Sequence, residues 1–362
     1  MIKIAINGCG RIGRIVFKAI TSKQDWGRVQ LSPRIDRGSL EVVALNNLGG
    51  IDDSLAHLFK YDSVYGTYPG EVRAGDNGKS LFFDGGEYPF FNEADPEQLP
   101  WGELEVDVVL ECTGAFTDFQ KARAHIRAGA KRVVITANGK GEGLTLVLGT
   151  DSIKVLDQGV DDPVQLEVVA GTSCTTNCAG PVVQLLHDHL TVLKAQMVTV
   201  HAVTSTQSLV DVVNKNMRRS RAAYASIVPQ STGAAEAVTK AIPDLDGRIS
   251  GAAYRVPVLC GSVLEVVAQV QKETTVEEVN SIFKTAAQGD LGGIIEVSED
   301  GLVSSDIIGN PVASVVDLAL TEVIDLPGVK DENMVKVVAW YDNEYGAVCR
   351  YVELAQILAR LG

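Results

Sequence analysis

The segment after the first predicted strand carries three glycines at a fixed spacing. Residues 3–6 predict a short strand, and apolar side chains recur at helical spacing over residues 15–20. Between them lie Gly8, Gly10 and Gly13, in the G-x-G-x-x-G spacing. A dinucleotide pyrophosphate needs close approach of the backbone and the amino end of a helix to receive its charge. A glycine-rich turn alone can be purely structural, but this one lies between a strand and a helix, so we predict a dinucleotide site.

Strands and helical patterns alternate through the first half of the chain. Residues 42–46, 106–111 and 133–135 are nearly continuous apolar runs, which suit buried parallel strands. Helical patterns separate these runs. The predicted fold class is α/β, with a Rossmann-type doubly wound parallel sheet whose ligand lies at the carboxyl ends of the strands.

Three stretches of this half carry further local expectations. Residues 70–92 predict a β-hairpin excursion from the sheet, because glycines interrupt short alternating runs. A helix is expected from Asp118 through Ala130, and residues 166–170 are read as a strand. Residues 22–39 are polar and look like an insertion in a loop, to which the sequence assigns no function.

The pattern changes in the second half of the chain. Residues 197–202, 264–270 and 335–340 predict long strands with few intervening helices. Such an arrangement is typical of an antiparallel or mixed sheet in an α+β domain. A last helix follows, with apolar residues from Val348 to Ala359 on one face.

With 362 residues, the chain is long enough for two domains. We expect residues 1–173 to form the dinucleotide-binding domain and residues 174–342 to form a catalytic and oligomerisation domain. The helix over about residues 343–362 is expected to pack back on the first domain.

Composition excludes several classes of protein. The formal net charge of -14 argues against general affinity for nucleic acid phosphates. No apolar stretch approaches the ~20 residues of a membrane span, and the amino terminus lacks a signal-peptide layout, so we expect a cytoplasmic protein without a membrane partner. The six cysteines are too scattered for a disulfide framework. Cys174 and Cys178 suggest half a metal site, but no second pair completes it, so no metal is expected.

Cys174 is the candidate nucleophile. It lies where a helical pattern begins, so unpaired N–H groups and the positive end of the helix dipole favour its thiolate. The alternative is a buried cysteine that packs as a small hydrophobic residue, which is the commoner role of a lone cysteine. The functional interpretation therefore depends on the residues around it.

His201, at the end of a predicted strand, is the candidate base. It would lower the pKa of Cys174 and then shuttle the proton, although a lone histidine on a strand is more often a core residue. Hydroxyl groups, a helix start and arginines in the same half are candidates to hold phosphate groups. These candidates are Ser173, Thr175, Thr204, Arg219, Thr232, Gly233 and Arg255. The alternative for such arginines is a surface or intersubunit ion pair.

A dinucleotide site together with a thiol and a histidine suggests oxidation of an aldehyde through a covalent thioester. Asn47 stands where an NAD-preferring Rossmann fold usually offers Asp or Glu to the ribose hydroxyls. Asparagine can bind a hydroxyl but carries no charge to repel a 2′-phosphate. The choice between NAD and NADP is therefore left open, with NAD slightly favoured.

The sequence strongly resembles the phosphorylating glyceraldehyde-3-phosphate dehydrogenase family. The resemblance rests on motifs that span the chain in the family's order, and the cysteine motif is the most specific of them. These motifs are INGCGRIGR at residues 6–14, KYDS at 60–63, SCTTNC at 173–178, STGAA at 231–235, RVP at 255–257 and WYDNEYG at 340–346.

The resemblance implies a role for each matching residue. Cys174 matches the nucleophile and His201 the base. Asn343 resembles the residue that orients the nicotinamide amide. The remaining cofactor contacts implied are Gly8, Gly10, Arg11, Ile12, Gly13, Asn47, Thr113 and Thr136. The implied site for inorganic phosphate is Ser173, Thr175, Arg219, Thr232 and Gly233, and Thr204 and Arg255 would hold the phosphate of the substrate.

The resemblance also implies an activity and an assembly. Glyceraldehyde 3-phosphate, inorganic phosphate and NAD(P)+ would be converted into 1,3-bisphosphoglycerate and NAD(P)H, in glycolysis and glucose metabolism. The family is a homotetramer joined partly by a long loop, here residues 205–227. Two alternatives are an erythrose-4-phosphate dehydrogenase, which releases the acyl group to water, and a non-catalytic nucleotide-binding scaffold.

Overall fold

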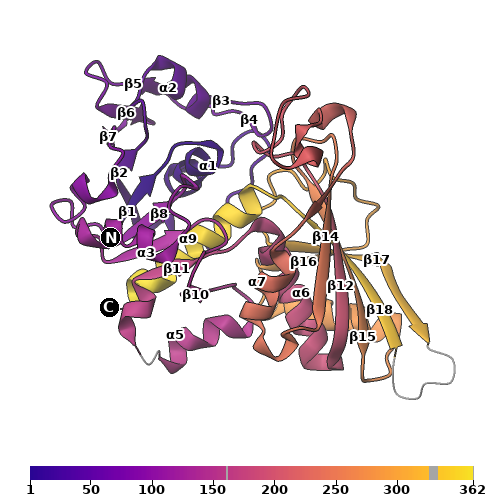
Figure 1. Cartoon of the computed structure of the whole chain (residues 1–362). Coiled ribbons are helices and arrows are strands. Elements are labelled where there is room, and N and C mark those ends of the chain that lie inside the picture. The colour runs from indigo at the N-terminus through magenta and orange to yellow at the C-terminus, as the bar shows by residue number, and fades with distance from the viewer. Residues whose placement is uncertain (160–161, 326–332, 362) are drawn as a thin grey trace. The chain divides into compact units, whose positions relative to one another are not determined.

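The computed structural model of the chain describes residues 1–159, 162–325 and 333–361. The chain forms two compact units (Figure 1). The first unit consists of Met1–Leu146, Lys154–Thr172 and Val348–Gly362. The second unit consists of Val147–Ile153 and Ser173–Ala347.

The described residues of the first unit form a nine-stranded sheet in the order β10-β11-β9-β8-β1-β2-β7-β6-β5. Neighbouring strands from β10 to β7 are parallel, whereas β6 and β5 continue the sheet antiparallel. The strands are β1 (Ile2–Asn7), β2 (Leu40–Asn46), β5 (Val72–Ala74), β6 (Ser80–Phe83), β7 (Gly86–Phe91), β8 (Val108–Glu111), β9 (Arg132–Ile135), β10 (Leu144–Thr145) and β11 (Val168–Ala170). Two short strands, β3 (Tyr61–Asp62) and β4 (Gly66–Thr67), pair separately.

Helices connect and cover these strands, as a doubly wound fold requires. They are α1 (Arg11–Thr21), α2 (Asp53–Lys60), α3 (Phe119–Ala122), α4 (Ala124–Arg127), α5 (Val155–Gln158) and most of α9 (Tyr345–Arg360). The apolar strand residues that the sequence placed in the interior are buried, including Val109, Val133 and Ile135 in the core cluster. The predicted Rossmann-type fold class is confirmed.

Three local expectations need correction. The hairpin of residues 70–92 is no excursion from the sheet, because β7 pairs with β2 and so extends it. The helix expected from Asp118 to Ala130 breaks into α3 and α4 and ends at Arg127. Gly129 follows with a φ of 101°, which a continuing helix does not permit. The strand expected from residue 166 begins only at Val168.

The order of β2, β1 and β8 defines the ligand edge of the first sheet. The chain passes from β1 to β2 on one side, and β8 returns to the other side of β1. Asn7, the last residue of β1, is the register partner of both Asn46 and Glu111. The loops that follow these strands therefore leave the sheet side by side at a topological switch point, where open α/β sheets bind ligands.

The insertion of residues 22–39 has a packing role. Arg34 Nε donates to Glu353 Oε2 at 2.9 Å, and the Asp36 N–H donates to Gln356 Oε1 at 2.8 Å. These contacts fasten the insertion to the closing helix α9. The closing helix expected over about residues 343–362 is present from Tyr345 to Arg360. Gly362 lies outside the described residues.

The second unit is built on a seven-stranded mixed sheet. Its described strands follow the order β13-β14-β12-β15-β18-β17-β16, with β12–β14 and β16–β17 parallel and the other pairs antiparallel. They are β12 (Val192–His201), β13 (Val228–Ser231), β14 (Ile249–Arg255), β15 (Ser262–Val270), β16 (Ile295–Ser298), β17 (Ser314–Asp325) and β18 (Asn333–Tyr341). The prediction of an α+β unit with a mixed sheet is confirmed.

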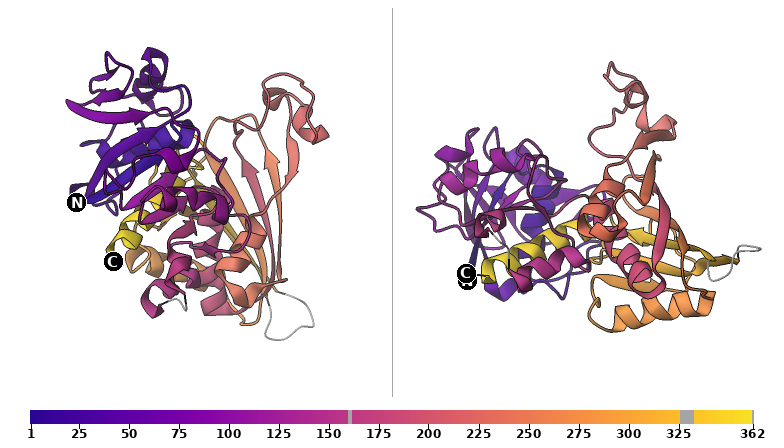
Figure 2. Two further views of the ribbon diagram at one scale, coloured as in Figure 1. Left: turned by 60° about the vertical axis from the view of Figure 1, so that its left-hand side comes forward. Right: turned by 60° about the horizontal axis from the view of Figure 1, so that its bottom comes forward.

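Three helices of the second unit form one layer against this sheet. Helix α6 (Cys174–Leu190) contacts both α7 (Ala234–Ala241) and α8 (Val276–Gln288), and all three contact sheet strands. Figure 2 shows this layer, with α8 in orange. Helix α6 begins at Cys174 because Ser173 caps it, with its Oγ accepting from the Thr176 N–H at 3.3 Å.

The Ser173 cap can be tested by its effect on the first turn of α6. Ser173→Ala should destabilise that turn by about 1 kcal/mol, which corresponds to about fivefold faster amide exchange at Thr176. Hydrogen exchange followed by mass spectrometry measures this rate. Ser173→Thr keeps a capping hydroxyl and is the matched control. Equal exchange in the alanine variant and the wild type would show that the cap does not hold the helix start.

Candidate active site

Cys174 and His201 meet in the second unit. Cys174 is the first residue of α6 and His201 is the last residue of β12. Sγ of Cys174 lies 3.3 Å from Nε2 of His201. Cys174 is partly accessible, whereas only 2% of the surface of His201 is exposed. The two residues that the sequence selected 27 positions apart therefore form a direct thiol–imidazole contact.

Two groups of opposite hydrogen-bonding character face Nδ1 of His201. The Ala202 carbonyl oxygen lies 2.7 Å from Nδ1 and can only accept, whereas Arg255 Nη1, which also contacts Nδ1, can only donate. These contacts hold the ring with Nε2 toward the thiol but do not by themselves assign the ring proton. Arg255 Nη1 also donates to the Ala202 carbonyl at 3.0 Å. The parallel register of β12 with β14 produces this arrangement, since Arg255 is the register partner of His201.

Burial and Arg255 together set the charge states of the pair. Burial raises the pKa of the Cys174 thiol, although Arg255 and hydrogen bonds with Thr175 oppose the rise. Burial and the Arg255 charge lower the pKa of His201 to about 3. The pair therefore rests as a neutral thiol against a neutral imidazole. The expectation that the helix start and His201 lower the thiol pKa is corrected, because loss of hydration outweighs the favourable contacts.

The two candidate arginines lack carboxylate partners. In the described chain, no salt bridge to an acid involves Arg219 or Arg255, and the buried Nε of Arg255 has no hydrogen-bond partner. Arg219 Nε donates to Gln230 Oε1 at 3.3 Å. Burial and the charge of Arg219 lower the pKa of Arg255, so the two cations lie within electrostatic reach. Uncompensated positive charge of this kind suits an anionic ligand.

The hydroxyl candidates are placed differently from one another. Thr204 Oγ1 lies 2.9 Å from Thr206 Oγ1 in the exposed loop after β12. Thr232 accepts from the Ala234 N–H at 3.1 Å, and Gly233 is the residue just before α7. Both therefore lie at a helix start, the geometry expected of an anion site.

Thr175 turns its hydroxyl inward. Its Oγ1 lies 3.0 Å from the hydroxyl of Tyr341, which in turn lies 2.8 Å from Thr199 Oγ1. The ring of Tyr341 meets the imidazole of His201 edge to face, with centroids 5.9 Å apart. Tyr341 belongs to the WYDNEYG motif at residues 340–346, but its sequence pattern indicated no role for it. Its only signal was its place in that motif, at the end of an apolar strand.

Asn343 has a fixed amide orientation. Its Oδ1 accepts from the Gly261 N–H at 3.1 Å and from Ser262 Oγ at 2.9 Å. A backbone N–H can only donate, so the oxygen assignment follows from chemistry. Nδ2 is left to act as a donor.

The glycine-rich turn of the first unit fits a dinucleotide. Gly8 has a φ of 95°, and a Cβ there would lie 2.8 Å from Thr113. A Cβ at Gly13 would lie 1.8 Å from the Gly8 carbonyl oxygen. A Cβ at Gly10 would meet no heavy atom within 4 Å, among the described residues. The first and third glycines thus allow the turn and the helix to pack, and the second keeps space open at the start of α1.

The other candidate cofactor residues of the first unit surround this turn. The Cys9 N–H donates to Asn47 Oδ1 at 3.0 Å, and Asn47 Nδ2 donates to the Leu48 carbonyl at 2.8 Å. Thr113 and Thr136 both bond to Glu111. Arg11 and Ile12 begin α1, and the side chain of Arg11 pairs with Asp62 at 2.6 Å. Arg11 therefore offers its backbone to a ligand at the helix start.

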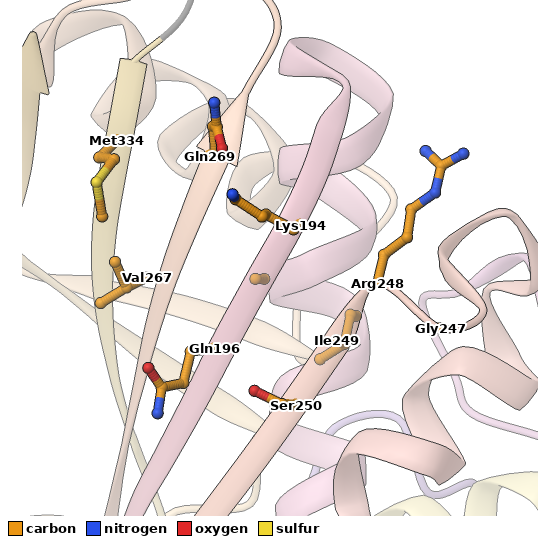
Figure 3. Close-up of a pocket in the computed structure, with 10 residues that line it drawn as sticks. Lys194, Gln196, Gly247, Arg248, Ile249, Ser250, Val267, Gln269 and Met334 are labelled. Atoms are coloured by element: carbon orange, nitrogen blue, oxygen red, sulfur yellow. The ribbon is translucent and has the colours of Figure 1, made fainter. Parts of the chain in front are cut away.

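A separate hollow of about 790 Å³ contains none of the candidate residues. It lies over the half of β12 remote from His201, and Figure 3 shows Lys194 there beside Gln269, with Gln196 further along the same strand. The described residues contain no group of three or more side chains suited to hold a metal ion. None of the described helices is long and apolar enough to span a membrane.

Together, a Rossmann unit with an open glycine turn and a unit with a thiol–imidazole pair define a class of nucleotide-linked thiol oxidoreductases. Residues 2–119 match the family model "Glyceraldehyde 3-phosphate dehydrogenase, NAD binding domain", and residues 173–343 match "Glyceraldehyde 3-phosphate dehydrogenase, C-terminal domain". The chain belongs to the glyceraldehyde-3-phosphate dehydrogenase family.

Individual relatives agree over nearly the full chain. The glyceraldehyde-3-phosphate dehydrogenase of Geobacillus stearothermophilus is 44% identical over 361 residues, covering 100% of this chain and 99% of the relative. That of Clostridium pasteurianum is 42% identical over 363 residues, with 100% and 99% covered. The chloroplastic glyceraldehyde-3-phosphate dehydrogenase A of Zea mays is 43% identical, covering 99% of this chain and 82% of the relative.

The effect of Arg255 on the thiol can be measured by alkylation. A cation stabilises a thiolate, so Arg255→Gln should raise the pKa of Cys174 and move the pH midpoint of iodoacetamide alkylation up by about one unit. Arg221→Gln is the matched control, because Arg221 is largely exposed and pairs with Asp211 at 3.1 Å. A midpoint in Arg255→Gln that is equal to or below that of the wild type would contradict this assignment.

The second and third glycines of the turn offer a matched pair. Gly13→Ala should lower the thermal unfolding midpoint, because its methyl group would overlap the Gly8 carbonyl. Gly10→Ala should leave that midpoint within about 2 °C, since φ is -65° and the site is open. It should nevertheless weaken NAD+ binding in calorimetric titration. Unchanged affinity in Gly10→Ala would mean that the open space is not where a dinucleotide approaches.

Proposed function

We propose that this protein oxidises glyceraldehyde 3-phosphate with inorganic phosphate and NAD(P)+, giving 1,3-bisphosphoglycerate and NAD(P)H. The observation that carries the proposal is the 3.3 Å contact between Cys174 Sγ and His201 Nε2, in a chain of this family. Cys174 is the proposed nucleophile and His201 the proposed base.

The neutral pair suits a coupled first step. As Sγ attacks the aldehyde carbon, Nε2 of His201 takes the thiol proton, so that neither group carries a buried charge beforehand. Arg255 favours the thiolate as it forms, while the Nδ1 contact with Ala202 holds the ring in place. The former carbonyl oxygen then takes this proton from Nε2 of His201, so the product of the step is a hemithioacetal on Cys174.

The second step converts the hemithioacetal into a thioester. The hydroxyl of the hemithioacetal gives its proton to Nε2 of His201, and its carbon loses hydrogen with the bonding pair. NAD(P)+, when bound, supplies the hydride acceptor. The glycine turn, Thr113 and Thr136 would hold the dinucleotide, and Asn343 would donate from Nδ2 to the nicotinamide amide.

Phosphate then releases the acyl group. An oxygen of inorganic phosphate bonds to the thioester carbon, the carbon–sulfur bond breaks, and the thiol recovers a proton. Thr204 and Arg255 are the proposed ligands of the substrate phosphate. The proposed ligands of inorganic phosphate are Ser173, Thr175, Arg219, Thr232 and Gly233. The hydroxyl of Thr175 points toward Tyr341, so Thr175 would bind inorganic phosphate through its backbone N–H.

The proposed cofactor is NAD or NADP, with NAD slightly favoured. Both polar ends of Asn47 are bonded within the chain, to Cys9 and Leu48. An uncharged amide in this position does not repel a 2′-phosphate, as a carboxylate would. We therefore expect measurable turnover with both dinucleotides.

Assembly and organisation form part of the same proposal. We assign dinucleotide binding to residues 1–173 with the closing helix, and catalysis and assembly to residues 174–342. We also propose a homotetramer, supported by large apolar side chains exposed in the loop over residues 205–227, including Leu209, Val213 and Met217. A cytoplasmic location is expected.

The direct test is formation of NADH and NADPH from glyceraldehyde 3-phosphate, with and without inorganic phosphate. The expected result is phosphate-dependent turnover that Cys174→Ser abolishes without loss of NAD+ binding. Cys178→Ser is the matched control, since it removes a buried thiol from the same helix. Turnover of erythrose 4-phosphate alone, or none with any aldehyde phosphate despite tight NAD+ binding, would reject the proposal.

A further inference from the structure

A row of buried polar side chains crosses the first sheet just below the glycine turn. Asn46, Asn7 and Glu111 end strands β2, β1 and β8, and they are register partners. Their exposed fractions are 4%, 1% and 2%. The proposed mechanism uses none of them. Because buried polar groups are costly unless they are hydrogen-bonded, three in one row require an explanation.

The two asparagines are oriented by the backbone. The Glu93 N–H donates to Asn46 Oδ1 at 2.9 Å, so the oxygen of Asn46 is fixed on that side. Asn46 Nδ2 then donates to Asn7 Oδ1 at 2.7 Å. Asn7 Nδ2 donates in turn to Glu111 Oε2 at 2.6 Å. Each amide is thus fixed by the one before it, and the series ends on the carboxylate.

A second series reaches the same carboxylate from the other side. The indole Nε1–H of Trp101 can only donate, and it lies 2.9 Å from Nδ1 of His125. Nδ1 is therefore an acceptor, and the imidazole proton is on Nε2. Nε2 lies 3.1 Å from Glu111 Oε2 and donates to it. His125 and Trp101 are fully buried, so no water competes for these bonds.

The other oxygen of Glu111 holds the loop after β8. Oε1 accepts from the Thr113 N–H at 2.8 Å and also from the Thr113 hydroxyl. The Glu111 carbonyl accepts from the Thr136 N–H at 3.1 Å and from Thr136 Oγ1 at 2.9 Å. Thr113 in turn lies against Gly8, where a Cβ would be 2.8 Å away.

We propose that Glu111 is a positioning residue for the dinucleotide site, because its carboxylate aligns the loop after β8 with the end of β1. Thr113, which is proposed to contact the cofactor, donates to the Glu111 carboxylate from its N–H and its hydroxyl. Thr136, the other such residue nearby, donates to the backbone carbonyl of Glu111. This inference rests on the proposal that the first unit binds NAD(P).

An amide in place of the carboxylate should disturb this alignment. In Glu111→Gln one end of the side chain becomes a donor, which must face either Thr113 or the pair of Asn7 and His125. Asn7 cannot turn to relieve the conflict, because Asn46 is fixed by the backbone of Glu93. One buried donor therefore loses its acceptor.

The test is calorimetric titration of cofactor-free, full-length protein with NAD+. Glu111→Gln should raise the dissociation constant about tenfold, with thermal unfolding recorded alongside. Alkylation of Cys174 in the absence of cofactor should keep its wild-type rate. A merely structural carboxylate would lower the unfolding temperature and leave the affinity of the folded protein unchanged. That result would overturn the inference.

A charge exchange provides the matched rescue. In the double variant Asn7→Asp with Glu111→Gln, the new Asp would accept from Asn46 and from the amide of the new Gln. It would also accept from His125, whose Nε2 now lies 3.4 Å from Asn7 Nδ2. The oxygen of the new Gln would then serve Thr113, so every donor again has an acceptor. Affinity should return to within about threefold of the wild type.

The outcomes separate this inference from the proposed function. Wild-type protein that binds no dinucleotide would reject both. Tight binding by the wild type and equal binding by Glu111→Gln would reject only the role of Glu111. Should the single variant fail to fold, the double variant decides, because weak binding by that variant when folded would contradict the alignment role.

Discussion

The parallel pairing of β12 with β14 is the constraint on which the second unit's site depends. It places His201 beside Arg255 at the ends of the two strands, and α6 begins with Cys174 in contact with the same imidazole. A hydrogen-bonded ladder holds these backbone positions, so the two side chains start from neighbouring positions at the strand ends. The charge states of the thiol and the imidazole therefore follow from strand register as much as from the residues themselves.

In each unit, one charged side chain lies at the carboxyl ends of parallel strands without a partner of opposite charge among the described residues. In the second unit a partly buried cation, Arg255, donates to the Ala202 carbonyl and has no acidic partner among the described residues. In the first unit a buried carboxylate, Glu111, is held by neutral donors alone. Dipoles in a low-dielectric interior can support a single charge when each is oriented toward it. Such networks also fix the positions of neighbouring loops.

Local features of the fold could be predicted from the sequence. The glycine turn, the strand before it and the helix start at Cys174 each depend on residues within a few positions of one another. The pairing of residues 70–92 with β2 could not be predicted, because a hairpin pattern does not say which strand it joins. The early end of the helix after Asp118 had a signal, Gly129, that the helical spacing concealed.

The site was predictable in its residue types and not in its electrostatics. Cys174 and Arg255 were selected from their motifs, and His201 from its place at the end of a predicted strand. The contact among them depends on pairing between distant strands. The thiol pKa was misjudged because burial does not show in a local pattern. Glu111 was read only as the end of an apolar strand, since its partners Asn7 and His125 come from other elements. The roles of the phosphate-binding candidates stay predictions.

The central claim is that Cys174 carries the acyl group during turnover. The most direct measurement is the intact mass of the protein after mixing with glyceraldehyde 3-phosphate and NAD+ in phosphate-free buffer, with peptide mapping of the product. The account predicts a phosphoglyceroyl adduct on Cys174 that disappears when inorganic phosphate is added. NADH formation without any adduct at Cys174, or an adduct that phosphate does not remove, would contradict it.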